Sequence, residues 1–255
     1  MKEQENHLHL NKAINHIIRN FTDVPNLEEV SKISGFSKFH FHRLFKAYTG
    51  ETLHQFIKRI RLERAAFLLV FQKHRSITDV ALSCGFSSSQ NFATAFKKHF
   101  NSTPKSYKEH KKCQGILVTE PKLISQYNDI QLKYIDSFNL AYQRTFRPYN
   151  EESFTQTRYE FLKKYPNRHY ISIFWDDPTI TLEKNCKYDY GYLIENPHEK
   201  TETEILSLQT MEARTYIILS IEFKQLRDIK SVEVWQYLYT NWLPRHGYVA
   251  DTLFC

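Results

Sequence analysis

The chain has 255 residues, enough for two ordinary domains with buried cores, and a formal net charge of +7. Its first ten residues are polar and charged, and its longest apolar run, Ala65–Phe71, is too short to cross a bilayer. The four cysteines show no CxxC spacing, which argues against a zinc site or a disulfide framework. We therefore expect a cytoplasmic protein without a membrane segment.

The positive charge is concentrated in the first half of the chain. Residues 1–115 contain 19 Lys and Arg against 9 Asp and Glu, a net charge of +10. Residues 116–255 contain the remaining 16 Lys and Arg against 19 Asp and Glu, a net charge of −3. This asymmetry predicts one polyanion-binding domain joined to a domain with a different role.

One pattern occurs twice in the basic half. The segment at 26–37, NLEEVSKISGFS, returns at 76–87 as SITDVALSCGFS. Each copy predicts a capped short helix, a Gly-Phe turn, a serine cap and a second helix. Two helix-turn-helix units in a basic segment indicate a protein that reads double-stranded DNA.

The predicted helices of this half can be placed from their apolar spacing and caps. Residues 9–20 form an amphipathic helix, and Asn26 with Glu29 forms a capping box for the next one. Ser37 caps a helix that runs to about Tyr48, where Thr49-Gly50 ends it. A long helix over residues 53–69 follows and would fix the separation of the two units. Ser76 with Asp79 caps the start of the second unit.

The helix after Ser37 has one apolar and one polar face. Phe41, Phe45 and their neighbours pack inward, and the opposite face suits a major groove. On that face Arg43 can bond guanine in a bidentate manner, His42 can donate to a purine, and Phe39 can touch a thymine methyl group. Lys38 and Lys46 lie where phosphates flank the groove.

The second unit offers a weaker reading face. We expect Ser87 and Gln90 to form a further capping box, with Gln90 serving either that cap or an adenine. Base discrimination would then rest mainly on the first unit. The second unit would contribute the base-facing residues Ser89, Gln90 and Thr94, and backbone contacts from Lys97, Lys98 and Lys105.

Residues 8–112 resemble the DNA-binding domain of the AraC/XylS family of bacterial transcription regulators. The matching residues are SKFHFHRLFK at 37–46, Thr49-Gly50, Arg61-Leu62 with Ala65, VALSCGF at 80–86, Phe96-Lys97 and Pro104. The resemblance implies that a linking helix holds two units in adjacent major-groove segments of an asymmetric site, bound by a monomer. It also maps the base-reading positions onto Phe39, His42, Arg43, Ser89, Gln90 and Thr94.

The histidines of the basic half offer a competing chemistry. His40 and His42 stand two positions apart and therefore point to different sides of a helix, so they cannot share a metal there. We expect no metal and no cofactor.

Beyond a linker at residues 113–126 the sequence predicts an α+β domain over residues 127–255. Strands are expected at 130–135, 140–146, 171–175 and 188–194, around a helix that runs from Asn150 to about Tyr165 and is stopped by Pro166. Strands at 205–208 and 215–223 and a helix at 231–243, stopped by Pro244, then repeat the order. The fold class is thus multidomain, an all-α double helix-turn-helix domain followed by a duplicated strand-strand-helix domain.

This second half resembles the GyrI-like effector domain. The matching residues are Arg144 with Pro148-Tyr149, Asp176-Asp177-Pro178, KYDYG at 187–191 and WLPRHGY at 242–248. The resemblance implies a groove between the two repeats for a small amphipathic, aromatic or cationic effector. No glutamate follows Phe254, so the family's terminal strands and their charge are expected to be absent. Candidate pocket residues, which could instead be core, are Phe174, Trp175, Tyr190, Trp235, Tyr239 and Trp242.

The favoured function is a sequence-specific transcription regulator whose second half senses a small molecule or contacts RNA polymerase. An enzyme is disfavoured because no catalytic spacing of Ser, His and Asp, or of Cys and His, is visible. The alternatives that remain open are a small-molecule hydrolase and a module that inhibits another protein.

Overall fold

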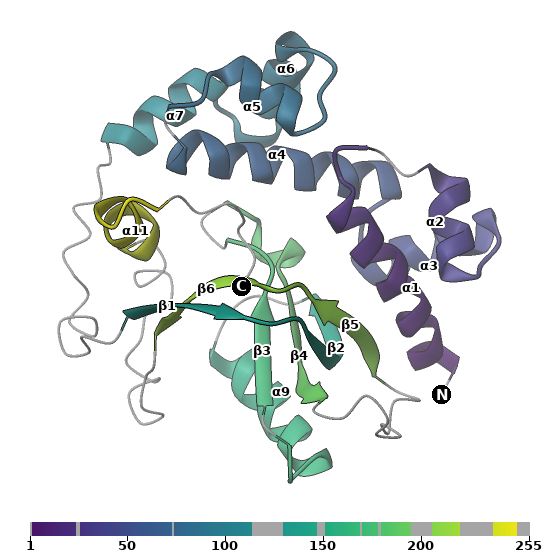
Figure 1. Cartoon of the computed structure of the whole chain (residues 1–255). Coiled ribbons are helices and arrows are strands. Elements are labelled where there is room, and N and C mark those ends of the chain that lie inside the picture. Colours follow the sequence, from purple (N-terminus) through teal and green to yellow (C-terminus); the bar gives the residue numbers. More distant parts are fainter. Residues whose placement is uncertain are drawn as a thin grey trace.

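The computed structural model describes residues 2–23, 26–72, 74–113, 130–146, 151–168, 170–177, 180–194, 206–219 and 237–248. Figure 1 shows two parts, a helical half formed by the first 113 residues and an α+β half beneath it. The predicted linker lies largely outside the described residues, as do Trp235 and the last residues of the chain.

The helical half follows the predicted order of elements. Its helices are α1 (Lys2–Arg19), α2 (Leu27–Ser34), α3 (Lys38–Thr49), α4 (Leu53–Phe71), α5 (Ile77–Ser83), α6 (Ser89–Phe100) and α7 (Pro104–Cys113). The first helix begins seven residues before the predicted start at His9. Its added turns are mostly polar, so the apolar spacing used for the prediction could not reveal them.

Two apolar clusters build this half, one for each helix-turn-helix unit. The first surrounds Phe41, Phe45 and Phe56, and the second surrounds Phe67, Phe92 and Phe96, all with no exposed surface. Helix α4 contributes to both clusters, so one continuous helix connects the cores. A continuous helix is a stiff spacer, and this agrees with the predicted role of the linking helix.

The α+β half contains two antiparallel sheets. A four-stranded sheet has the order β3 (Tyr170–Phe174), β4 (Lys187–Ile194), β2 (Phe138–Phe146), β5 (Ser207–Met211). A second sheet pairs β1 (Ile130–Ile135) with β6 (Arg214–Leu219), and Ile130 lies opposite Leu219. Strands β1 and β2 thus pair with strands β6 and β5, which follow them by more than 60 residues.

Two sequence predictions need correction in this half. The strand predicted at 205–208 lies at Ser207–Met211, where it pairs with β2. Pro244 does not stop the last helix. The π-helix η3 (Leu238–Trp242) continues into α11 (Leu243–Arg245), so the helix ends one residue after Pro244 and not before it.

The four-stranded sheet lies between helices from both halves of the molecule. Helix α9 (Glu151–Lys164) packs through Phe161 against Tyr190 and Tyr192 on one face. On the opposite face Arg144 and Asp189 form a fully buried ion pair at 2.7 Å. Helix α1 of the helical half meets β5, and Asn11 donates a hydrogen bond to Ser207 at 2.9 Å. The two halves are therefore joined by direct contacts as well as by the chain.

Candidate nucleic-acid interface

The first helix pair is held by local caps. The Asn26 side chain accepts the Glu29 N–H at the start of α2, and Gly35 ends α2 in the left-handed conformation with φ 70°. The Ser37 side chain accepts the His40 N–H and starts α3, and Gly50 with φ 76° ends it. These caps fix the direction in which α3 leaves the turn. The predicted caps at Asn26 and Ser37 are confirmed, but the Glu29 carboxylate contacts His16 and does not complete the predicted capping box.

Helix α3 presents the predicted polar face to solvent. Phe39 is 81% exposed, a high value for a large apolar side chain, and His42, Arg43 and Lys46 are exposed beside it. The opposite face is anchored by the fully buried Phe41 and Phe45. The described structure gives the Arg43 guanidinium a single long contact, 3.5 Å to the His40 ring, so it is available for a base edge.

Helix α6 has a different cap from the one predicted. Ser88, and not Ser87, is the N-cap, because its hydroxyl accepts the Asn91 N–H at 3.1 Å. Ser87 instead accepts the Asn91 side-chain amide at 3.0 Å. Gln90 is exposed in the first turn of the helix, and no hydrogen bond from its side chain to the cap is found in the described part of the chain.

The remaining residues of the second face are small or basic. Thr94 is exposed, but its hydroxyl donates to the Gln90 carbonyl at 3.1 Å, and Ser89 is half-buried. Lys97, Lys98 and Lys105 are exposed. This composition suits backbone contact better than base discrimination.

Lys38 and Lys46 of the first unit are both exposed, and they differ in their partners. Lys38 forms an ion pair with Glu28 of α2 at 2.8 Å. Hydrogen bonds to Lys38 and Lys32 lower the pKa of the Glu28 carboxyl. Exposed ion pairs of this kind stabilise little, so Lys38 can exchange its partner for a phosphate.

Arg61 of α4 connects the two units. Its Nε donates to the Phe21 carbonyl and its Nη2 to the Thr22 carbonyl, both at 2.7 Å. Its guanidinium also lies against Gly85 of the second turn, where a Cβ would approach the Arg61 Cζ and the Thr22 carbonyl oxygen at 2.8 Å. One side chain thus contacts the loop before the first unit and the turn of the second.

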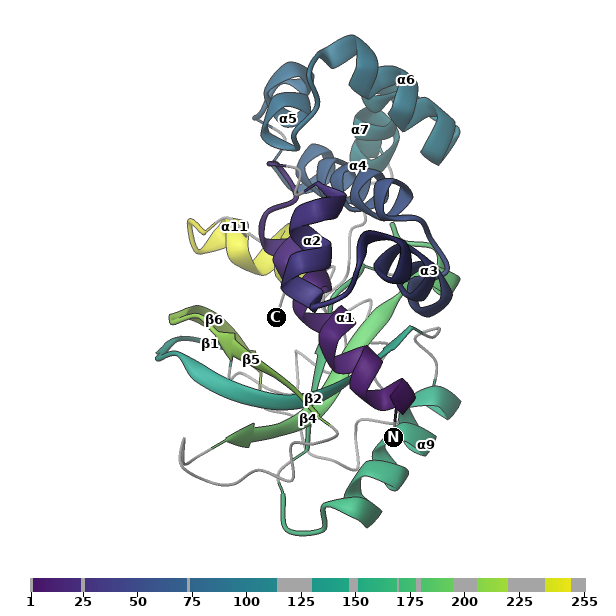
Figure 2. The same ribbon diagram turned by 90° about the vertical axis from the view of Figure 1, so that its right-hand side faces the viewer.

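The two candidate recognition helices lie on the same side of the helical half, at the right in Figure 2. Between the units lies a groove of about 550 Å³, lined by α2, α4 and α6. It contains His54 and Lys58 of α4, which the sequence analysis did not single out. They stand four residues apart and so share one face of α4, and this spacing was the available signal.

Other chemistry finds little support in the described residues. No group of three or more His, Cys, Asp or Glu there could hold a metal ion. Cys84 is buried, and this burial raises the pKa of its thiol to about 11, which disfavours the reactive thiolate. Within the same residues no helix has the length and apolar character needed to span a membrane.

The candidate pocket aromatics of the second half are distributed over separate contacts. Phe174 packs on Phe154, Trp175 joins the cluster around Tyr142, and Tyr190 packs on Phe161. The Trp242 ring stacks on the His246 ring, with the two ring centroids 4.2 Å apart. Tyr239 contacts Phe67 and Phe71 of α4, so it belongs to the contact between the two halves. The five candidates that lie in the described residues thus make their contacts in separate places, and Trp235 lies outside these residues.

Comparison with known proteins bears on both halves. Residues 30–110 match the family model described as a helix-turn-helix domain. The chain is 43% identical over 84 residues to the probable transcription factor PqrA of Proteus vulgaris, an alignment that covers 33% of this chain and 68% of PqrA. The chain belongs to the AraC/XylS family of transcription regulators.

The second half of this AraC-family regulator also has a known relationship. Residues 128–254 match the GyrI-like small molecule binding domain. The transcriptional regulator Rob of Salmonella typhimurium is 23% identical over 209 residues, which is 77% of this chain and 72% of Rob, so the similarity extends beyond the helical half. A solved AraC-type transcriptional regulator from Chromobacterium violaceum is 31% identical, with a TM-score of 0.39 over 42% of this chain and 95% of its own.

Proposed function

We propose that this AraC-family regulator reads duplex DNA with α3 and α6 placed in adjacent segments of the major groove. The observation that supports this most directly is the exposed face of α3, where Phe39, His42 and Arg43 project from a helix whose opposite face is buried. A side chain of each kind needed for base edges is present: a bidentate donor, a single donor and an apolar contact.

The two helix-turn-helix units would contribute unequally to base selection. In the first unit Arg43 and His42 would select bases, and Lys38 and Lys46 would bond the flanking phosphates. In the second unit Gln90 is the side chain suited to an adenine, and Ser89 and Thr94 would add minor discrimination. The DNA phosphates would be bound by Lys97, Lys98 and Lys105. Base changes in the DNA segment under α6 should therefore lower the binding affinity less than base changes under α3.

The second half would tune this binding in the cytoplasm. We propose that it senses a small molecule, as its GyrI-like family description suggests, with contact to RNA polymerase as the alternative. Since both units lie in one chain on one rigid helix, a monomer would suffice for an asymmetric site. The domains would extend over residues 8–112 and 127–255, and the proposal assigns no catalysis to either.

Substitution of Arg43 tests the base-reading assignment. After selection of the preferred site from a random DNA library, Arg43→Ala should weaken binding to that site by about 1–3 kcal/mol and relax the preference at one base pair. Fluorescence anisotropy with the selected duplex and with its single-base variants measures both quantities. Arg214→Ala, which removes a half-exposed arginine of β6, is the matched control and should leave binding unchanged.

The result that would contradict the proposal is equally specific. If Arg43→Ala weakened binding to the selected site and to random DNA by the same factor, Arg43 would be a backbone contact. If no DNA sequence were enriched in the selection at physiological salt, the proposal of sequence-specific DNA binding would be contradicted.

A further inference from the structure

The C-terminal end of helix α3 lies against the second half of the molecule. Tyr48, in the last turn of α3, is partly buried there. Its ring meets the Phe146 ring of β2 edge-on, with the two centroids 5.1 Å apart. Its hydroxyl lies 3.4 Å from the Arg144 carbonyl oxygen of the same strand. The second half therefore touches the helix that carries the base-reading side chains of the first unit.

The same tyrosine also contacts α1. Its hydroxyl can donate to the Asn11 side-chain oxygen at 3.2 Å, and the Asn11 amide donates to Ser207 of β5 at 2.9 Å. The His7 ring of α1 stacks on the Tyr48 ring, with the centroids 4.3 Å apart. Burial raises the pKa of the Tyr48 hydroxyl, so this group stays protonated and remains a donor. One side chain of α3 thus contacts α1 and β2, and reaches β5 through Asn11.

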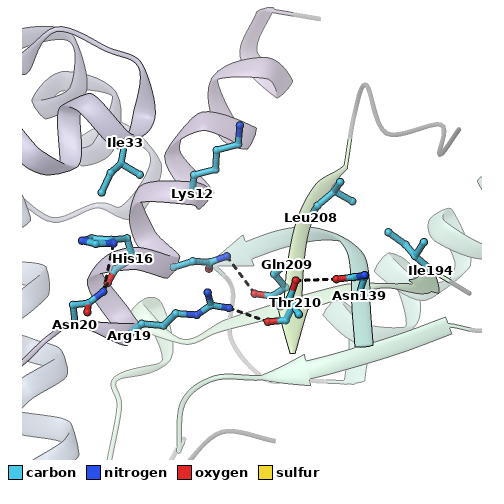
Figure 3. A pocket seen from close by; sticks show the side chains of 11 residues that line it. Lys12, His16, Arg19, Asn20, Ile33, Asn139, Ile194, Leu208, Gln209 and Thr210 are labelled. Carbon is cyan, nitrogen blue, oxygen red and sulfur yellow. Dashed lines mark hydrogen bonds between the residues drawn. The ribbon is translucent and has the colours of Figure 1, made fainter. Parts of the chain in front are cut away.

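Helix α1 is in turn docked on the sheet of the second half. The Arg19 Nη2 donates to the Thr210 carbonyl of β5 at 2.9 Å, a contact drawn in Figure 3. The Asn15 amide donates to the Tyr142 hydroxyl at 2.9 Å and to the Gln209 side-chain oxygen at 3.2 Å. The end of α3 is therefore held by α1, which is bonded to the sheet, and by β2, a strand of that sheet.

The part of β2 that α3 contacts is itself well anchored. Strand β5 pairs with β2 over residues 138–142, so Arg144 and Phe146 lie beyond that pairing. Both are paired with β4, and the Arg144 guanidinium forms the fully buried ion pair with Asp189 at 2.7 Å. Phe146 also packs on the apolar cluster of the first helix-turn-helix unit. A strand end fixed in this way is a firm support for a neighbouring helix.

Small rotations of α3 matter for base reading because the reading residues lie some distance from this support. Arg43 stands five positions before Tyr48, which is about 7.5 Å along the helix. A tilt of about 8° at Tyr48 therefore moves the Arg43 backbone by roughly 1 Å. A shift of this size exceeds the width of the range, about 2.7–3.2 Å, in which an N–H···O hydrogen bond forms.

We propose that the second half positions α3 for base reading through the contact between Tyr48 and Phe146. The two side chains are positioning residues, because they act without touching DNA and set the angle at which Arg43 meets its base. The inference rests on the proposed function of α3 as a reading helix. It adds that the second half contributes to sequence preference in the absence of any effector.

Phe146→Ala tests the contact from the second half, since it leaves every residue of the helical half unchanged. The full-length protein is used with the duplex selected from the random library, and Arg43→Ala identifies the base pair under α3. Fluorescence anisotropy gives the ratio of affinities for this duplex and for the duplex altered at that pair. We expect the ratio to fall about 3- to 10-fold, part of the discrimination that one bidentate contact supplies. Ratios for base pairs about one helical turn away, under α6, should not change.

Two further variants separate positioning from a loss of stability. Phe174→Ala removes a partly buried ring from the opposite face of the same sheet, where Phe174 packs on Phe154 and Tyr188, and should change neither ratio. Phe146→Leu keeps an apolar side chain at the contact and should restore most of the discrimination. Thermal midpoints from circular dichroism check that each variant is folded at the assay temperature.

Tyr48→Phe tests the contact from the side of α3. It keeps the ring and removes the hydroxyl, so the Asn11 oxygen and the Arg144 carbonyl lose this donor. We expect the ratio under α3 to fall about 2- to 5-fold, the loss of one ordinary hydrogen bond. Tyr159→Phe, which removes a hydroxyl from a tyrosine of α9 that is 68% exposed, is the matched control and should have no effect.

The outcomes that would overturn the proposal are distinct. Full discrimination in Phe146→Ala would show that the second half does not position α3. Equal losses under α3 and α6, or the same loss in Phe174→Ala, would show a general loss of stability. In these cases the unaltered protein still selects its sequence, so the inference fails alone. Absence of any enriched sequence with the unaltered protein would overturn the proposed function, and this inference with it.

Discussion

At the scale of single residues, the contact between Arg61 and Gly85 constrains one glycine of the repeated pattern. Gly85 has φ 77°, which only glycine adopts without cost, and the space above its Cα is taken by the Arg61 guanidinium and the Thr22 carbonyl. Gly50 has nearly the same backbone conformation, but no atom lies within 4 Å of the position its Cβ would take. An alanine at Gly50 would therefore meet only backbone strain, whereas an alanine at Gly85 would meet both backbone strain and a steric conflict.

Gly85→Ala should destabilise the protein more than Gly50→Ala. For Gly50 only the left-handed strain of about 1–2 kcal/mol is expected. For Gly85 the same strain is joined by displacement of Arg61 from the carbonyls of Phe21 and Thr22, so we expect at least about 1 kcal/mol more. Urea denaturation followed by circular dichroism measures both variants. Equal losses would show that Arg61 moves aside freely.

At the scale of the elements, the helical half was largely predictable because its signals are local. Asn26, Ser37 and Ser76 were predicted as caps, and the structure confirms each. The cap of α6 was wrong by one residue, since three consecutive serines offer the same oxygen and local pattern cannot choose among them. The boundaries of β5 depend on its pairing with β2, a partner distant in sequence that periodicity does not report.

The residues of the candidate site can likewise be separated into those that local sequence pattern predicts and those that it does not. The exposed faces of α3 and α6 follow from helical spacing, so their residues could be named in advance. The contact between Arg19 and Thr210 could not be predicted, because these residues are 191 positions apart and meet only through the docking of the two halves. The scattered placement of the predicted pocket aromatics has the same cause.

Helix α6 leads to a prediction about backbone contacts. Lys97→Ala should weaken binding to every duplex alike, because a phosphate contact carries no sequence information. The slope of log affinity against log salt should become shallower by about 0.9, the value for one released counterion. Lys163→Ala, which removes an exposed lysine of α9, is the matched control. An unchanged slope for Lys97→Ala would remove this lysine from the interface.

At the scale of the whole molecule, a buried cluster of charges lies where α4 meets the second half. Arg59 bonds both Glu51 and Glu63, at 2.8 Å and 2.9 Å, and Asp176 bonds Lys187 nearby at 2.6 Å. Burial raises the pKa of Glu63 to about 7, an effect that Arg59 opposes and that the charge of Asp176 strengthens. The folded protein thus holds this proton more tightly than the unfolded chain does.

The sign of the resulting pH dependence follows directly. Since the ordinary pKa of this carboxyl is 4.5, its contribution to stability is complete below pH 4.5 and is lost as the pH rises to about 7. Glu63→Gln should remove a decrease of up to about 3 kcal/mol in unfolding free energy over that range. Denaturation at a series of pH values measures it, with Glu160→Gln on the exposed face of α9 as control. Parallel curves for Glu63→Gln and the unaltered protein would contradict the prediction.

The pairing of β1 with β6, and of β2 with β5, also has a consequence for the order of events on the ribosome. The helical half is complete at Cys113, whereas β6 ends at Leu219. At about 5–20 residues per second, roughly 5–20 s of translation separate the two. During that interval the nascent chain can possess both reading helices while Asn11, Asn15 and Arg19 still lack their strand partners. The helical half of a newly made molecule would therefore be able to bind DNA before the second half is complete and able to bind an effector.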